Sequence, residues 1–223
     1  MPEYTVHPLN RLQTLVARNM HQALQETAHA TLHTECDITT LVDTLGGMSE
    51  DEPVSVSTYV LYALTRALKE HPCLNAHIAT DELCIYNKVK LGLMVHSGYG
   101  IMQACLSDAA SLNLYELEAA VKDLHARARK GHLQLSETRG ATFMVADLSA
   151  FPVDAFTPIL LPSVMAMLGI GRVRPACRPG KRGCRPVKLL SLSLTFDHRG
   201  TDAIVAGHFL RSLTGRLEHP VED

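Results

Sequence analysis

The spacing of apolar residues along the chain predicts a mixture of helices and strands. In four segments, apolar side chains recur near the helical period. The predicted helices cover residues 8–27, 56–71, 113–130 and about 201–217. Alternating or continuously apolar runs between turn residues predict strands. The predicted strands cover 29–40, two short runs within 82–95, 101–106, 141–148, 164–173 and 188–196.

Neither an internal repeat nor a linker interrupts this pattern. Residues 1–223 are therefore predicted to form one α+β domain with a mixed sheet. The segment 174–186 is rich in arginine and proline, which favours a basic loop or the tip of a hairpin.

The composition is that of an ordinary globular protein, because 46% of the 223 residues are hydrophobic and 20% are charged. A net charge of -2 gives the whole chain no electrostatic reason to bind nucleic acid or an anionic membrane. The best apolar stretch, Thr157–Gly171, contains prolines and is shorter than the ~20 residues that a membrane span needs. We therefore expect no nucleic-acid partner and no membrane contact.

The N-terminus has neither a basic start nor an apolar run, so no secretory signal is expected and the prediction is a cytoplasmic protein. In a reducing compartment, the six cysteines are expected to be free thiols. Cys177 and Cys184 could meet across a turn, but no further ligands lie nearby at metal-binding spacing. We expect no metal site.

The predicted strand 188–196 leads directly into a polar segment that precedes the last helix. This segment reads Asp197-His198-Arg199-Gly200-Thr201-Asp202. A histidine at such a junction is held by rigid elements and titrates near neutral pH, which suits a general base. Asp202 lies one helical turn beyond His198 and could orient nearby groups.

This segment resembles the His-x-x-x-Asp-Gly signature of chloramphenicol acetyltransferases and of the catalytic domains of dihydrolipoamide acyltransferases. Further motifs of the acyltransferases occur in order along residues 5–218. They include Arg11-x-x-x-x-x-Ala17-x-x-Met20, His29-Ala30-Thr31, Asp37-Ile38-Thr39, Lys69-Glu70-His71-Pro72, Gly140-Ala141-Thr142-Phe143 and Phe156-Thr157-Pro158-Ile159. A chain made of this domain alone is similar to the free-standing acetyltransferases of tetronate natural-product pathways.

The resemblance implies an α/β two-layer sandwich like that of chloramphenicol acetyltransferase, assembled as a homotrimer with each active site between subunits. It implies acetyl-CoA as co-substrate, with no bound cofactor. His198 would take the proton from the acceptor, which then attacks the thioester. Asp202, Arg199 and Asp197 would support the site. No lipoyl domain and no peripheral-subunit-binding domain are recognised, and the acidic end of the chain favours a trimer over a larger shell.

One departure concerns the tetrahedral intermediate, which the family stabilises with a serine or threonine hydroxyl. The matching position is Ala146. Losing such a donor typically costs ~10²–10³ in rate. Ser149, Thr142 and Ser97 are candidate replacements, and Asp147 could bind an acceptor hydroxyl. In addition, Ala203 occupies the glycine position of the signature.

The basic segment offers a further hypothesis. Arg178, Lys181 and Arg182 could attract the phosphates of CoA or of a carrier arm. The alternative is a solvated hairpin tip.

Three functions remain open from the sequence. The first is acetyl transfer from acetyl-CoA to a hydroxyl acceptor of the tetronate type, either a small molecule or carrier-bound, with His198 as general base. The second is acyl transfer to dihydrolipoamide on a separate lipoyl protein. The third is a trimeric scaffold that has lost turnover through Ala146, which the retention of His198 argues against.

Overall fold

The fold is built on a six-stranded mixed sheet with the strand order β1-β8-β7-β6-β4-β5. The computed structural model describes residues 3–48, 53–97, 100–161, 164–180 and 183–220. The strands of this sheet are β1 (His29–Asp37), β4 (Leu91–Ser97), β5 (Gly100–Leu106), β6 (Phe143–Asp147), β7 (Ala166–Gly180) and β8 (Gly183–Asp197). β4, β6 and β7 are parallel, whereas β5, β8 and β1 pair antiparallel to their neighbours. A separate hairpin joins β2 (Ala76–Ala79) to β3 (Glu82–Ile85).

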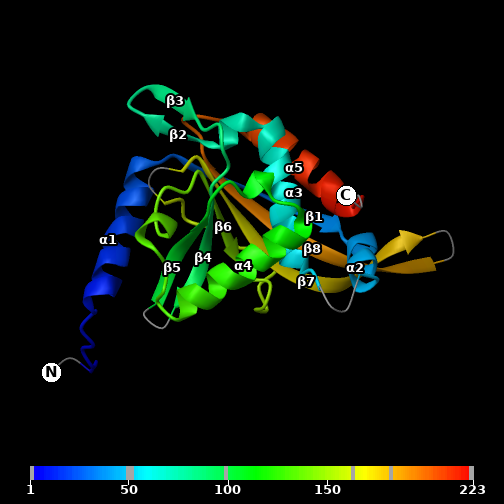
Figure 1. The fold of residues 1–223 in the computed structure, drawn as a ribbon, viewed down its shortest axis with the longest axis horizontal. Helices are drawn as coiled ribbons and strands as arrows, with labels where there is room; N and C mark the ends of the chain where they lie inside the picture. Colours follow the sequence, from blue (N-terminus) through cyan, green and yellow to red (C-terminus); the bar gives the residue numbers. More distant parts are fainter. Residues whose placement is uncertain (1–2, 49–52, 98–99, 162–163, 181–182, 221–223) are drawn as a thin grey trace.

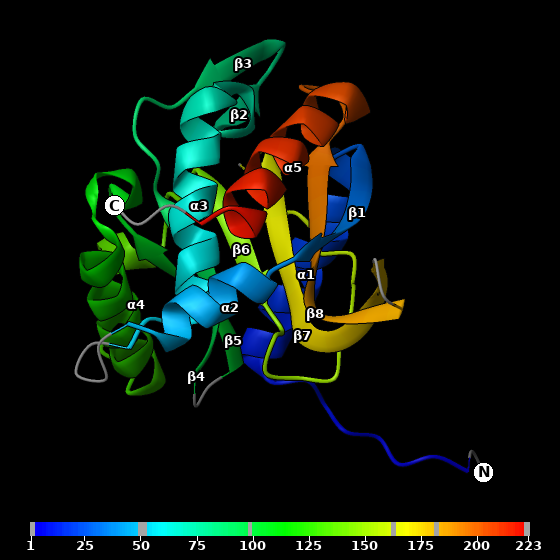
Figure 2. The same ribbon diagram turned by 90° about the vertical axis from the view of Figure 1, so that its right-hand side faces the viewer.

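Helices cover one face of the large sheet (Figures 1 and 2). They are α2 (Thr39–Gly46), α3 (Val56–Glu70), α4 (Leu114–Arg129) and α5 (Ala203–Glu218). The core lies between them and the sheet, where Phe143, Phe196 and Phe209 are fully buried. The first helix, α1 (Arg11–Glu26), stands on the other side of the sheet. This arrangement confirms the predicted α/β sandwich of one sheet and one helical layer.

Local sequence explains where the predicted helices begin. Asn10 and Asn113 each accept a hydrogen bond from the backbone N–H three residues later, and the side chain there bonds back to the cap. Ser55 caps α3 in the same way, although without the reciprocal bond. The four long helices therefore match the predicted segments to within a few residues.

For the segment 174–186 the structure confirms the hairpin alternative and excludes the loop, because most of the segment is strand. β7 and β8 stay paired to Gly180 and Gly183, so they form a long arm that projects past α2 (Figure 1). Cys177 and Cys184 face each other on this arm, with their Cα atoms 5.8 Å apart, and are joined as a disulfide. The expectation of free thiols is wrong for this pair, whereas Cys36, Cys73, Cys84 and Cys105 are free.

Two short elements, the helix α2 and the strand β2, were not predicted. The predicted strand 29–40 ends at Asp37, because the hydroxyl of Thr39 bonds to the Asp37 carboxylate and starts α2. β2 has only four residues, too few for a periodic signal.

None of the helices in the described ranges is long and apolar enough to cross a membrane.

Candidate active site

His198 lies in a tight turn between the end of β8 and the start of α5. Its backbone N–H donates to the Ala28 carbonyl at 2.8 Å, which fixes the turn to the chain just before β1. The N–H groups of Gly200 and Thr201 both donate to the Asp197 carbonyl and close the turn. The imidazole is exposed, and within the described ranges neither of its ring nitrogens has a hydrogen-bond partner. The candidate base is therefore held by its backbone, and its ring lies beside that of Phe196 with the centroids 5.8 Å apart, while both ring nitrogens stay open to a substrate.

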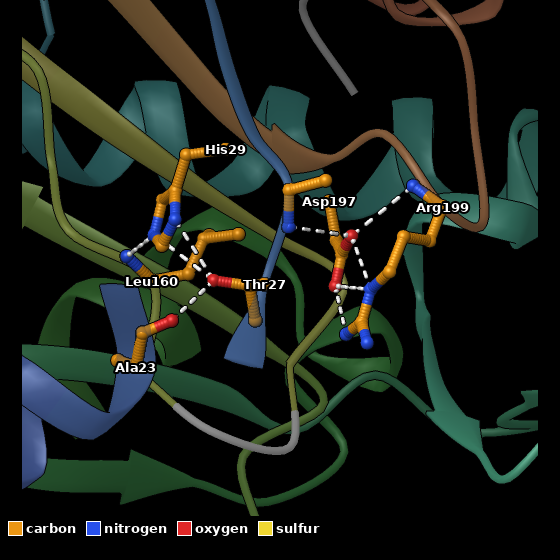
Figure 3. Close-up of polar contacts among 7 residues, drawn as sticks. Ala23, Thr27, His29, Leu160, Asp197 and Arg199 are labelled. Atoms are coloured by element: carbon orange, nitrogen blue, oxygen red, sulfur yellow. Dashed lines mark hydrogen bonds and ion pairs between the residues drawn. The ribbon is translucent and has the colours of Figure 1, made fainter. Parts of the chain in front are cut away.

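The neighbouring Asp197 and Arg199 form the polar support of this turn (Figure 3). The Asp197 side chain is 4% exposed and accepts from the guanidinium of Arg199 at 2.5 and 3.0 Å. It also accepts from the backbone N–H groups of Arg199 and Ala28. Burial of the Asp197 carboxyl acts to raise its pKa, but these donors outweigh burial and lower the pKa below its usual value. The carboxylate therefore stays ionised and ties the loop before β1 to the turn that carries His198.

Asp202 and Ala203 form the start of α5. One Asp202 carboxylate oxygen accepts from the backbone N–H groups of Ile204 and Val205 at 2.8 and 2.9 Å. This is an N-cap, and no hydrogen bond to the His198 ring is present in the described part of the chain. Ala203 is the first helical residue, so this position needs no backbone conformation that alanine resists.

A chain of hydrogen bonds fixes His29 beside this turn (Figure 3). The Leu160 N–H donates to Nε2 of His29 at 3.0 Å, so the ring proton of neutral His29 is on Nδ1. Nδ1 lies 2.8 Å from the Thr27 hydroxyl, which donates in turn to the Ala23 carbonyl. His29 thus links α1, β1 and the segment before β7 through one defined tautomer. His33, four residues along the strand, instead bonds to the hydroxyl of Ser193.

Ala146 and Asp147 lie at the carboxyl end of β6, and His198 follows the carboxyl end of the antiparallel β8, so the two sites are separated along the strand direction. Ala146 pairs with Gly169 of β7, and Gly169 pairs with Ser193 of β8. His198 is five positions beyond Ser193 along the chain, which corresponds to about 16 Å at ~3.3 Å per residue. A single chain therefore does not bring the base and the family's hydroxyl position together.

The candidate replacements for that hydroxyl have different surroundings. Thr142 is buried, and its hydroxyl bonds to the backbone of Lys90. Ser97 is buried and donates to the Gly100 carbonyl at 2.8 Å. Both hydroxyls serve the backbone, which argues against their use as oxyanion donors. Ser149 donates its backbone N–H to Asp147, and its hydroxyl lies 3.4 Å from that of Ser57.

The positive charge of the arm is partly neutralised. Arg174 pairs with Glu35, and Arg185 pairs with Asp37. Arg178 is exposed on the arm, whereas Lys181 and Arg182 lie outside the described residues. The geometry leaves Arg178 as the described candidate for a phosphate contact.

Sequence reasoning missed a recess on the helical side of the sheet. Its mouth contains His125 and Arg129 of α4 together with Asp147. The i, i+4 spacing of Val121, His125 and Arg129 indicated a common helix face, but nothing in the sequence showed that this face opens onto a cavity.

The chain matches the family model described as 2-oxoacid dehydrogenases acyltransferase (catalytic domain) over residues 1–222. It is 32% identical to the dihydrolipoyllysine-residue acetyltransferase component of the acetoin cleaving system of Bacillus subtilis, over 96% of this chain and 55% of that protein. It is 33% identical to the corresponding component of the pyruvate dehydrogenase complex of Mycobacterium bovis, over 96% of this chain and 41% of that protein. The chain thus spans about half the length of these curated relatives.

Solved structures agree with this similarity. The dihydrolipoamide acetyltransferase of Azotobacter vinelandii superposes with a TM-score of 0.92 at 25% identity, over 97% of this chain and 92% of that one. That structure belongs to a study of the catalytic roles of a serine, a histidine and an asparagine. The cubic core of a pyruvate dehydrogenase multienzyme complex gives the same TM-score of 0.92 at 26% identity, over the same shares of 97% and 92%. A chloramphenicol acetyltransferase, with a TM-score of 0.52 at 13% identity over 90% of this chain and 92% of that one, is similar in fold alone.

Proposed function

Because the chain belongs to the 2-oxoacid dehydrogenases acyltransferase (catalytic domain) family, we propose that it transfers an acetyl group between acetyl-CoA and dihydrolipoyl thiols. The lipoyl group is carried by another domain or protein. The observation that carries the proposal is the exposed imidazole of His198, whose ring nitrogens have no hydrogen-bond partner among the described residues, in a turn fixed at both ends. The named relatives act on dihydrolipoyllysine residues, which favours a thiol acceptor.

In the proposed reaction, His198 takes the proton of the acceptor thiol as the sulfur attacks the thioester carbonyl of acetyl-CoA. A tetrahedral intermediate forms, and its collapse breaks the bond to the CoA sulfur. The imidazolium then returns the proton to the departing CoA thiolate. Asp197 and Arg199 hold the turn, so that the ring keeps its position during both proton transfers. Both substrates meet directly, and the protein needs no covalent intermediate.

We further propose that a neighbouring copy of the chain completes the site, in a homotrimer. The separation of about 16 Å along β8 between the register of Ala146 and His198 supports this arrangement, because one chain leaves the two positions too far apart to act on one carbonyl group. In such an assembly, His198 of one subunit faces the Ala146 end of the next. The exposed Arg178 is the described arginine of the arm that we assign to the CoA phosphates, with Lys181 and Arg182 as further candidates.

Acetyl transfer to a hydroxyl acceptor is the second candidate function. The specific observation is Ala146, which lacks the hydroxyl that the family signature carries for the thiol reaction. An altered acceptor, as in tetronate-type pathways, is consistent with that change. An alcohol is less acidic than a thiol, so this reaction depends even more strongly on the base.

The test is CoA formation from acetyl-CoA, measured by chromatography because dihydrolipoamide itself carries thiols. Dihydrolipoamide, a separate lipoyl domain and a panel of primary alcohols are offered in parallel. We expect turnover with the dihydrolipoyl acceptors and a loss of about 10²–10⁴-fold in the His198→Ala variant. The matched control is His208→Ala, which removes another exposed histidine.

Each outcome separates the candidates. Turnover with alcohols alone would replace the thiol proposal with O-acetylation. Full activity of His198→Ala would refute the assignment of the base. No turnover with any acceptor, together with no binding of CoA, would leave only the third hypothesis, a trimeric scaffold without catalytic activity.

A further inference from the structure

A recess opens at the carboxyl ends of the parallel strands β4 and β6, beside Ile170 in the first half of β7, on the helical side of the sheet. It has a volume of about 270 Å³ and lies between these strand ends and helices α3 and α4. After β4 the chain moves outward to β5, and after β6 it moves the other way to β7. In open α/β sheets, such a point of divergence at the carboxyl ends of parallel strands is where small ligands bind.

The floor of the recess is apolar and comes from distant parts of the chain. It consists of Leu61 of α3, Leu93 and Val95 of β4, Val121 of α4, Val145 of β6 and Ile170 of β7. Successive residues of a strand point to opposite faces. Val145 joins the core on the helical side, whereas Ala146 packs against the smaller apolar cluster on the other side of the sheet. The side chain at the family's hydroxyl position therefore lies on the opposite face from the floor of the recess, although Met94, which packs on that same face, also contributes to the wall.

The rim of the recess is rigid. The loop 148–154 is fastened to β7 by the Leu148 N–H on the Ile170 carbonyl and by the Arg172 N–H on the Val153 carbonyl. Arg172 also pairs with Asp154 at 2.6 Å. Gly171 permits this contact, because a Cβ there would lie 2.0 Å from the Asp154 carbonyl oxygen. A recess with fixed walls binds a ligand at a smaller entropic cost than a mobile one.

The mouth carries polar groups whose charges cancel. Burial, aided by the charge of Arg129, lowers the pKa of His125, so its imidazole is neutral at pH 7. Asp147 and Arg129 carry opposite charges, and neither has an ion-pair partner in the described ranges. One carboxylate oxygen of Asp147 accepts the Ser149 N–H, and the other is left to accept from a ligand. Asp147 and Arg129 are both exposed at the mouth, and their opposite charges give a charged ligand no net attraction. A charged ligand would also have to bring its charge against the apolar floor, so the recess favours an uncharged ligand with a hydrogen-bond donor.

We propose that this recess binds a small aliphatic alcohol, with its hydrocarbon chain on the apolar floor and its hydroxyl donating to Asp147. A cavity of 150 Å³ holds benzene, so 270 Å³ corresponds to about ten non-hydrogen atoms. The recess is far too small for CoA, and no group of the His198 turn lines it. The inference is therefore independent of the proposed acyl transfer.

The test is saturation-transfer NMR of 1-hexanol with the intact protein, followed by a titration for the Kd. Ala150 is exposed at the rim, so Ala150→Trp blocks the mouth without disturbing the core. Its matched control is Ala155→Trp, at an exposed position outside the recess. A second pair compares Asp147→Ala with Asp81→Ala, which removes an exposed carboxylate of the β2–β3 turn. Hexanoate and hexylammonium serve as charged ligands of the same length.

We expect 1-hexanol to bind the wild-type protein, both control variants and His198→Ala alike. Ala150→Trp abolishes binding, and Asp147→Ala weakens it about tenfold through the loss of one hydrogen bond to a charged group. Hexanoate and hexylammonium bind at least tenfold more weakly than 1-hexanol. The proposal is overturned if 1-hexanol fails to bind, if Ala150→Trp binds as well as Ala155→Trp, or if a charged ligand binds as tightly.

Discussion

At the scale of single residues, Ala146 is the position that most limits the proposed chemistry. A hydroxyl there would face the developing oxyanion across the subunit boundary in the proposed assembly. Such a donor is typically worth 10²–10³ in rate, or roughly 3–4 kcal/mol of transition-state stabilisation. The Thr142 and Ser97 hydroxyls both bond to the backbone, which argues against either of them as its replacement.

We therefore predict that Ala146→Ser raises kcat for transfer to dihydrolipoamide by about 10-fold or more, with little change in KM. Ala155→Ser, at an exposed position, is the control for a general effect of the added hydroxyl. Steady-state kinetics of the two variants measure the difference. An unchanged or lower kcat for Ala146→Ser would show that another donor already serves the oxyanion.

The Asp197–Arg199 pair gives a prediction with a defined pH dependence. The pKa of Asp197 is lower than normal in the folded protein, because its donors outweigh the effect of burial. Such a carboxylate stabilises the fold above its unfolded pKa of about 3.9, and this contribution is lost as the pH falls through the folded value. Arg199→Met should therefore cost about 1–3 kcal/mol at pH 7. Below about pH 4, the difference from wild type should shrink.

Urea unfolding at a series of pH values measures this difference. Arg211→Met, which removes another exposed arginine of α5, is the control and should show no such trend. If the loss in Arg199→Met were the same at pH 7 and at pH 3, the ionised state of Asp197 would not be the source of the stabilisation.

At the scale of secondary-structure elements, the start of α5 connects stability to the site. Asp202→Ala removes the acceptor of two backbone N–H groups and should lower the free energy of unfolding by about 1 kcal/mol. Because the first turn of α5 follows directly on the His198 turn, kcat should fall more than KM rises. Asp202→Asn keeps the cap and should restore both quantities. A loss of kcat in Asp202→Asn equal to that in Asp202→Ala would instead assign the carboxylate charge a direct role.

Periodicity was sufficient to predict the long elements but not the short ones. The helix predicted over 113–130 is observed as Leu114–Arg129, because its apolar face is regular and Asn113 caps it. By contrast, α2 begins inside the predicted strand 29–40, where a side-chain bond between Thr39 and Asp37 overrides the strand pattern. The prolines of 174–186 left a loop and a hairpin tip as alternatives, and in this arm the β7–β8 pairing continues past them as a hairpin.

In the candidate site too, features carried by one contiguous segment could be predicted, whereas contacts between distant segments could not. His198 could be predicted, because its motif is contiguous and follows a strand. The recess at Asp147 could not, because its floor combines two helices and three strands that are separated along the chain. The bond from Leu160 to His29 joins residues 131 positions apart, and local sequence carries no signal for such a contact.

At the scale of the whole molecule, α1 carries apolar surface that the single chain does not bury. Leu15 and Leu24 are 55% and 53% exposed. Burial of each leucine against a second subunit would contribute roughly 1.5–3 kcal/mol. We predict that the wild-type protein elutes as a trimer of about 73 kDa, three times the 24.4 kDa chain, and that the double variant Leu15→Glu/Leu24→Glu dissociates. Size-exclusion chromatography with light scattering measures both masses.

The control for this prediction is Leu135→Glu, which places a charge on another exposed leucine, at 69% exposure, in the connection after α4. It should leave the mass unchanged. A wild-type monomer would refute the shared site. A double variant that stays trimeric would show that α1 is not the contact.

If the active site is shared between subunits, two variants that are inactive on their own should regain activity when they assemble together. Ala146→Phe blocks the acceptor end of one subunit, and His198→Ala removes the base of another. Each homotrimer is inactive, because every interface carries one defect. In a mixed trimer, however, some interfaces join a chain with an intact His198 to a chain with an intact Ala146, and these interfaces are complete.

Co-expressing the two variants with different affinity tags, and purifying on both tags, should therefore recover a substantial fraction of wild-type kcat. The double variant carried on a single chain, mixed with wild type in the same way, controls for partial assembly. Recovery would place base and acceptor end on different subunits. Mixed trimers with no activity would mean that each chain uses its own His198 and Ala146 ends, which the register of β6, β7 and β8 keeps apart.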